Sequence, residues 1–195
     1  MRDINDFDIL IVPGWHNSGP DHWQTHWEAA FPNMHRVGQD DWETPIYSAW
    51  SRRLAEAVKR CERPVLLVAH SLGTALVTRW SQEAETDSVA GAFLVATSDV
   101  DRFAGTPGNP MLGFNPIIMK PLPFPSVVLA SHNDERVAFE RAAAFASAWG
   151  SRLVDVGSLG HIGSAAKLGL WPKGLVCLGQ FIASIVPENH GQARR

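Results

Sequence analysis

The sequence predicts an α/β fold in which a mostly parallel β-sheet carries helices on both faces. Short unbroken runs of aliphatic and β-branched residues, typical of strands buried on both sides, recur along the chain. Between them lie longer segments whose apolar residues repeat at three and four positions, the spacing of helices. Because strands that alternate with helices favour a parallel sheet, we expect a compact three-layer sandwich.

Six segments have the composition of strands. Four contain a continuous apolar run of suitable length, and the segment at 152–156 is interrupted by Asp155. The segment at 34–37 is the shortest and has the weakest pattern. In chain order, strands are predicted over residues 8–14, 34–37, 64–69, 91–96, 126–131 and 152–156.

Helices are predicted between these strands. The first begins at Ser18, a serine N-cap followed by Pro20 and Asp21 in the first turn. The last packs on the sheet through one apolar face, formed by Leu175, Leu178, Phe181, Ile182 and Ile185. The other helical patterns cover residues 48–59 and 72–80 and include residues 137–143, and the last helix covers residues 174–186.

Length and charge limit the classes of protein. A chain of 195 residues can bury about 70% of its unfolded surface around one core. We expect one domain over residues 1–187 and a tail over 188–195. The formal net charge is −3 and basic residues are not clustered, so nucleic acid is not an expected partner.

The strand at 64–69 leads to Ser71, where a helical pattern begins. A serine at such a junction has strained backbone geometry, and small residues two places before and after it let strand and helix approach. Ala69 and Gly73 meet this demand, although glycine is more usual at the first position. The turn presents the hydroxyl of Ser71 and frees the amide of Leu72 to bind an oxyanion. Ser71 is a candidate nucleophile, with a silent serine N-cap as the alternative.

A hydrolytic serine of this kind requires an acid and then a histidine, each after a later strand. Asp134 follows the strand at 126–131, and His161 lies in a glycine-bracketed loop after the last strand. We predict that His161 is the base and Asp134 its acid. Taken singly, Asp134 also suits a helix N-cap and His161 an ordinary loop, but their order after Ser71 favours the catalytic interpretation.

Other polar residues compete for these roles. Asp99 and Asp101 follow the strand at 91–96 and are the second choice, either for a role on the substrate side or as the acid of a variant triad. His132 is too close in sequence to Asp134 to bridge it to the nucleophile.

The loop after the first strand is predicted to complete the oxyanion hole. Trp15 and His16 are the candidates, and Trp15 is preferred because it directly follows Gly14. His16, His22 and His26 would suit a metal site, but His22 lacks the following Glu of a His-Glu-x-x-His motif, and the spacing suits packing equally well. No metal is therefore predicted.

Residues 99–125 contain six prolines and three glycines, which predicts a long ordered loop and leaves no room for a large lid. Loops of this length are usually functional. Their apolar side chains either line an acyl pocket or cover the core. We expect Met111 and Phe114 to contact substrate, together with His16 and His70 near the nucleophile.

These motifs resemble those of α/β-hydrolases and, more narrowly, of small serine hydrolases related to retinoblastoma-binding protein 9. The resemblance extends from Val12 to His161 and rests on Val12-Pro13-Gly14, Ser18-Gly19-Pro20-Asp21-His22-Trp23 with Trp27, Ala69-His70-Ser71-Leu72-Gly73, Asn133-Asp134 and Gly160-His161. It implies a Ser71, Asp134 and His161 triad in a minimal fold with little or no cap domain. Binding to pocket proteins is not implied, because Gly179 stands where a Leu-x-Cys-x-Glu motif needs Glu.

We therefore expect a serine hydrolase that cleaves a small carboxylic ester, thioester or amide through an acyl-enzyme, without metal or organic cofactor. The alternatives are a silent hydrolase-fold binding protein, a metal-dependent hydrolase and a lyase. The expected partner is a small acyl substrate, and the chain is expected to be a monomer or small homo-oligomer. Cys61 and Cys177 are isolated, and no signal-peptide core or membrane-length apolar run occurs, so the cytoplasm is the expected location.

Overall fold

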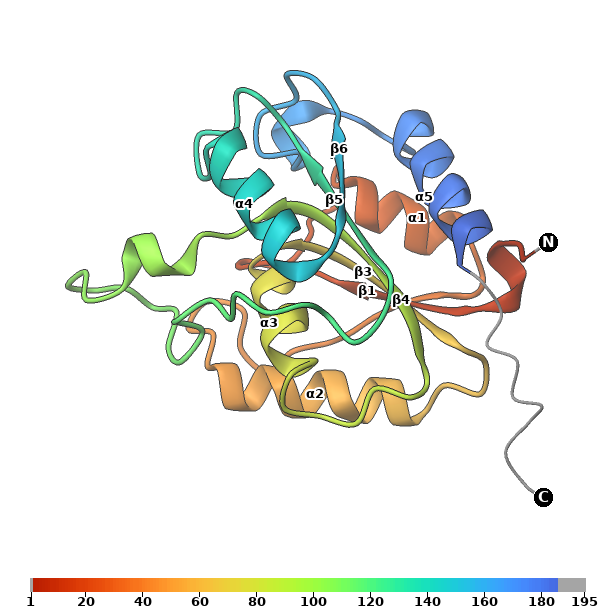
Figure 1. The fold of residues 1–195 in the computed structure, drawn as a ribbon, viewed down its shortest axis with the longest axis horizontal. Helices are drawn as coiled ribbons and strands as arrows, with labels where there is room; N and C mark the ends of the chain where they lie inside the picture. The colour runs from red at the N-terminus through yellow and green to blue at the C-terminus, as the bar shows by residue number, and fades with distance from the viewer. Residues whose placement is uncertain (1, 186–195) are drawn as a thin grey trace.

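In the computed structural model, which describes residues 2–185, six strands form one sheet in the order β2-β1-β3-β4-β5-β6 (Figure 1). Every pairing in it is parallel. The strands are β1 (Asp8–Val12), β2 (Met34–Arg36), β3 (Val65–Ser71), β4 (Val89–Thr97), β5 (Ser126–Ala130) and β6 (Arg152–Asp155). The predicted α/β class and parallel sheet are confirmed, and the strand ends differ from the predicted ones by one or two residues.

Five α-helices among the described residues cover the sheet: α1 (Trp23–Ala30), α2 (Tyr47–Lys59), α3 (Leu72–Trp80), α4 (Phe139–Trp149) and α5 (Pro172–Ser184). The described residues also form three short 3₁₀ helices: η1 (Ile4–Asp6) before β1, η2 (Val100–Phe103) after β4 and η3 (Ser164–Ala166) after β6. The predicted helix end at residue 186 and the predicted tail at 188–195 lie outside the described residues.

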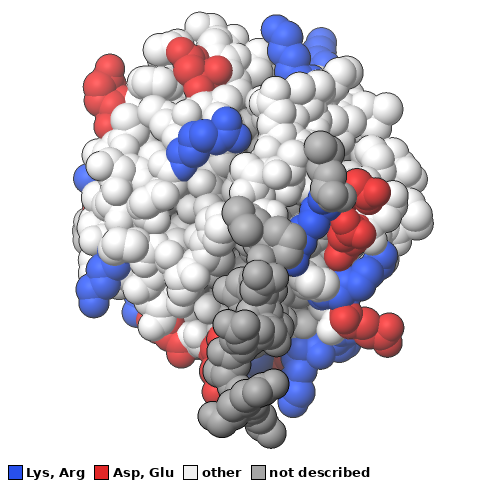
Figure 2. Space-filling view, turned by 45° about the vertical axis from the view of Figure 1, so that its right-hand side comes forward, with Lys and Arg blue, Asp and Glu red and all other residues white. Residues whose placement is uncertain are grey.

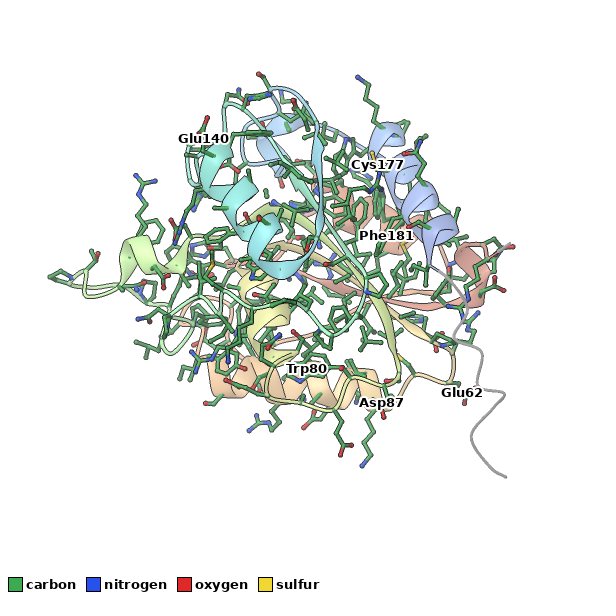
Figure 3. All side chains as sticks on the ribbon, viewed as in Figure 1. Glu62, Trp80, Asp87, Glu140, Cys177 and Phe181 are labelled. Atoms are coloured by element: carbon green, nitrogen blue, oxygen red, sulfur yellow. The ribbon has the colours of Figure 1, made fainter. Side chains whose placement is uncertain are left out.

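Two separate apolar clusters hold the helices against the two faces of the sheet. One contains side chains of α2, α3 and α4, among them Trp80, and the other contains those of α1 and α5, among them Phe181. Figure 3 shows Trp80 and Phe181 on opposite sides of the strands. Continuous strand runs such as Leu66 to Val68, which is 0% exposed, alternate between the two clusters, because successive side chains point to opposite faces. The three-layer sandwich follows from this pattern.

The first helix does not begin where the sequence predicted. Ser18 is not its N-cap: the amide of His22 donates to the Gly19 carbonyl in a turn, and α1 begins only at Trp23. The N-cap is His22, whose Nδ1 accepts from the Gln24 amide at 3.1 Å. The hydroxyl of Ser18 donates instead to Gln24 Oε1 at 2.6 Å. The Ser18 hydroxyl, which the local sequence pattern predicts to cap the helix, is thus hydrogen-bonded to a side chain within the helix.

The connection from β4 to β5 is the long ordered loop that the prolines predicted. It begins with η2 and projects beyond the sheet at the edge where the strands end, drawn in green in Figure 1. A bridge between Ile46 and Leu112 attaches it to the start of α2, and the Tyr47 amide donates to the Leu112 carbonyl at 2.9 Å. The loop is therefore positioned beside the carboxyl ends of the strands, where α/β folds bind ligands.

The surface charges are mixed. On the face in Figure 2, Lys and Arg are interspersed with Asp and Glu. Within residues 2–185, no helix has both the length and the apolar character required to cross a membrane.

Candidate active site

Ser71 ends β3 in a conformation that few side chains adopt, with φ 54° and ψ −125°. Two glycines make room for this turn. A Cβ on Gly73 would lie 2.3 Å from the carbonyl oxygen of Val12, and one on Gly14 would lie 2.8 Å from the Cβ of Ser71. The end of β1 thus packs directly against the turn, and Ser71 is presented at the carboxyl edge of the sheet.

Three side chains that lie far apart in the sequence form one hydrogen-bonded chain at this edge. His161 Nε2 lies 2.7 Å from Ser71 Oγ. Nδ1 of the same ring lies 2.8 Å and 3.0 Å from the two oxygens of Asp134. The side chain of Asp134 is 1% exposed and that of His161 12% exposed. The geometry leaves Nδ1 protonated toward the carboxylate and Nε2 as the acceptor for the serine proton.

Asp134 follows β5 but is not the N-cap of α4, which is Ala138. Its Oδ1 accepts from the amides of Arg136 at 2.8 Å and Val137 at 3.4 Å. A turn within residues 134–137 therefore fixes the carboxylate while it faces His161.

The loop that carries His161 is held by two polar residues that the sequence did not single out for this purpose. The Leu159 amide donates to Ser131 Oγ at 2.8 Å, and the Gly160 amide donates to Asn133 Oδ1 at 2.7 Å. The hydroxyl of Ser131 also donates to Asn133 Oδ1 at 2.9 Å. The sequence feature that could have identified Ser131 and Asn133 is their position between the end of β5 and Asp134.

Two backbone amides beside Ser71 suit an oxyanion. Leu72 begins α3, where helix amides have no intrahelical acceptor. Within residues 2–185, neither its amide nor that of Trp15 donates to a protein acceptor. The amide of His16, the second candidate, donates to the Trp42 carbonyl at 3.2 Å. The indole of Trp15 donates to the Glu43 carbonyl at 2.9 Å, which fixes this loop.

A cavity of about 280 Å³ opens at Ser71 beneath the β4–β5 loop. Its walls are Trp15, Ser71, Leu72, Ser98, Asp99, Phe103, residues 106–110, Met111 and Arg136. The predicted contact residue Met111 lies in this wall. Sequence reasoning missed Ser98, residues 106–110 and Arg136, because only the folded loop brings them to the nucleophile.

Three other predicted contact residues lie elsewhere. Phe114 is 1% exposed and packs edge-on against Tyr47 and Trp50 in the core. His16 points to solvent, stacks on Trp15 and pairs with Glu43 at 2.9 Å. The apolar character of Phe114 and the nearness of His16 to the oxyanion loop did not specify which way their side chains point.

His70 is also buried rather than exposed to a ligand. Its Nε2 lies 2.9 Å from the carbonyl oxygen of His161, and its ring meets that of His22 edge-on at 4.7 Å. Burial, with the nearby His22 and His161, holds the pKa of His70 well below its usual value. Burial, with the nearby Arg36 charge, lowers the pKa of His22 to about 4. Both rings are therefore neutral at neutral pH, and His70 Nε2 donates to the carbonyl of His161.

Asp99, Asp101 and His132 are paired with other residues, although Asp99 also lies in the wall of the cavity at Ser71. Asp99 accepts from Arg141 at 3.1 Å and 3.3 Å, and Asp101 accepts from the Ile117 amide at 3.0 Å. His132 pairs with Asp155 at 2.7 Å. Within residues 2–185, no group of three or more His, Cys, Asp or Glu side chains is arranged to hold a metal ion.

Comparisons with known proteins agree with this fold. A YdeN-like hydrolase from Pectobacterium atrosepticum is 34% identical, with a TM-score of 0.84 over 94% of each chain. The ydeN gene product of B. subtilis is 18% identical with a TM-score of 0.66, covering 90% of this chain and 98% of that one. Est1E of Butyrivibrio proteoclasticus, solved with ferulic acid, is 14% identical with a TM-score of 0.68, covering 90% and 89%. The last two likenesses show the fold alone.

Comparison with curated protein sequences gives no match. A family model of serine hydrolases matches residues 9–180, which include all three members of the hydrogen-bonded chain. The chain therefore belongs to the serine hydrolase family, within the α/β-hydrolase fold.

Proposed function

We propose that this protein hydrolyses small carboxylic esters, or the corresponding thioesters or amides, with Ser71 as nucleophile, His161 as base and Asp134 as acid. The observation that carries the proposal is the unbroken hydrogen-bonded chain from Asp134 through His161 to Ser71 Oγ. It ends at a cavity large enough for a small acyl group.

In the acylation step, Ser71 Oγ attacks the substrate carbonyl carbon and gives its proton to His161 Nε2. Asp134 holds the ring through Nδ1 and stabilises the imidazolium that forms. The amides of Leu72 and Trp15 face the developing oxyanion. The proton on Nε2 then passes to the leaving atom as its bond to the carbonyl carbon breaks.

Water completes the reaction. His161 Nε2 takes a proton from water while the water oxygen attacks the acyl carbon, and the same proton returns to Ser71 Oγ as the carboxylic acid departs. Neutral His70 and His22 support this cycle, because they place no positive charge beside an imidazole that must become protonated.

Labelling with a fluorophosphonate, followed by mass mapping of the adduct, tests the proposal. The expected result is stoichiometric modification at Ser71 that is lost in Ser71→Ala and His161→Ala. A folded wild-type protein that forms no adduct would contradict the proposal and favour a silent hydrolase-fold binding protein.

We propose further that a small acyl compound is the partner, that the protein is a monomer or small homo-oligomer, and that it works in the cytoplasm. The free thiols of Cys61 and Cys177 support a reducing compartment.

A further inference from the structure

Two cavities flank the Ser71–His161 pair. The first, of about 280 Å³, has Ser71 and Leu72 in its wall. The second, of about 450 Å³, has His161 in its wall and is formed by the loop after β5 and the segment from β6 to η3. Arg136 contributes to both walls and marks their boundary.

The walls of the two cavities differ in chemistry. Apolar side chains dominate the first, where Trp15, Leu72, Phe103 and Met111 are joined by Pro107 and Pro110. Its Asp99 is already paired with Arg141 at 3.1 Å. The first wall also includes Ser98, Thr106 and Asn109. Hydrogen-bonding side chains form a larger share of the second wall, namely Asn133, Glu135, Arg136, Ser158 and Ser164. A hydrocarbon group is thus favoured in the first cavity, and a hydroxylated or charged group in the second.

The order in which bonds form and break indicates which cavity faces the acyl group and which faces the leaving group. The acyl carbon becomes bonded to Ser71 Oγ while its oxygen faces the amides of Leu72 and Trp15, which all belong to the first cavity. The leaving oxygen receives its proton from His161 Nε2, and His161 belongs to the second. The leaving group therefore departs on the side of the second cavity.

We propose that the first cavity binds the acyl group and the second the leaving alcohol or thiol, so that the substrates are esters of a short apolar acid with a polar alcohol or thiol. This inference rests on the proposed function. At roughly 30 Å³ for each water-sized group, 280 Å³ holds about nine non-hydrogen atoms. This volume corresponds to an acyl group of about the size of an octanoyl chain.

The test separates the two halves of the substrate. One series varies the acid from acetyl to dodecanoyl with 4-nitrophenol as the common leaving group. A second keeps butyrate and compares its glycerol monoester with hexyl butyrate, two primary-alcohol esters that differ in polarity. For each variant, kcat/KM is reported as a ratio within a series, which removes any general loss of activity.

Met111→Ala enlarges the first cavity, and Thr106→Trp fills it from an exposed loop position. The expected effect is a change in acyl-length preference, toward longer and shorter chains respectively, by about tenfold for each methylene near the octanoyl length. The glycerol-to-hexyl ratio should stay within about twofold, because these variants leave the second cavity unchanged. A change of even one methylene-sized contact in that cavity would alter the ratio by more than twofold. Leu112→Ala is the matched control, because Leu112 is 50% exposed and lies outside the walls of this cavity.

Ala165→Trp fills the second cavity, with Leu170→Trp as the control for adding an exposed tryptophan on the same segment. Wild-type protein should prefer the glycerol ester, and Ala165→Trp should reduce that preference without changing the acyl-length profile. The proposal is overturned if Ala165→Trp changes acyl-length preference, if the first-cavity variants leave it unchanged, or if wild-type protein prefers the hexyl ester. A wild-type protein that forms no acyl-enzyme with any ester would instead overturn the proposed function, and this inference with it.

Discussion

At Ser71, a strained backbone is maintained by contacts that only glycine permits. The carbonyl oxygen of Val12 lies 2.3 Å from the position of a Cβ on Gly73, so no side chain fits between the junction and β1. Because strain of this kind persists only where the surroundings enforce it, the packing of β1 on the turn supports the strained conformation of Ser71.

Gly73→Ala is expected to lower the free energy of unfolding by about 1–3 kcal/mol, because the added methyl meets backbone rather than a flexible side chain. Gly179→Ala is the matched control: no atom lies within 4 Å of its Cβ position, and alanine in a helix should stabilise by about 1 kcal/mol. Urea unfolding measures both. Equal stability changes would contradict the close approach of β1.

Asp134→Asn tests the assignment of the acid. The amide keeps the shape of the carboxylate but favours the wrong tautomer of His161, so kcat should fall by about 10⁴-fold. In Ser71→Ala, kcat should fall by about 10⁶-fold. Asp99→Asn is the control for the competing acid, and ester hydrolysis is the measurement. A larger loss in Asp99→Asn than in Asp134→Asn would reverse the assignment.

Among elements, the strand that ends in Ser71 is hydrogen-bonded to the loop that carries His161. His70 is the residue before Ser71, and its Nε2 donates to the backbone carbonyl of His161 at 2.9 Å. Ser131 and Asn133 hold the same loop from β5. The position of His161 is thus set by two strands other than the one that precedes it.

His70→Leu removes this contact, whereas Gln at the same position can supply a donor close to Nε2. A displacement of the base of about 1 Å should lower kcat by roughly 100-fold in His70→Leu with KM little changed, and Gln should restore much of the loss. Leu178→Ala, a core substitution outside the site, controls for lost stability measured by thermal unfolding. An equal loss of kcat in Leu178→Ala would show that stability alone is responsible.

For the whole molecule, two neutral histidines buried behind the site make stability depend on pH. In the unfolded chain His22 takes up a proton as the pH falls through 6.5, whereas the folded protein keeps it neutral until its pKa of about 4. The unfolded state thus binds more protons in this window, so its free energy falls relative to that of the folded state. The contribution of neutral His22 to stability is therefore complete above pH 6.5 and is lost as the pH falls from 6.5 to about 4.

The free energy of unfolding should therefore decrease by roughly 3 kcal/mol between pH 7 and pH 4 on account of His22 alone. His22→Asn keeps an N-cap acceptor and removes the titration, so its pH dependence should be flatter by that amount. Thermal unfolding across this range measures the difference. Parallel curves for the two proteins would show that His22 does not contribute.

The fold class and the order of Ser71, Asp134 and His161 along the chain can be predicted from the amino-acid sequence. Apolar runs such as residues 64–69 are typical of strands that are buried on both faces. Because segments with helical spacing of apolar residues lie between these runs, a parallel sheet covered by helices is the favoured architecture. Ser71, Asp134 and His161 could be found because the carboxyl ends of parallel strands share one edge of the sheet.

Which side chains form the cavity wall depends on how distant segments of the chain pack together. Met111 and Phe114 have the same apolar character, yet the first lines the cavity and the second packs on Trp50 in the core. The sequence pattern predicts that Ser18 caps a helix, but its hydroxyl donates to Gln24. His70 is predicted to contact substrate, but its ring is buried and donates to the carbonyl of His161. Local patterns specify how much of a side chain is buried, whereas its partners are specified by segments that are distant in the sequence.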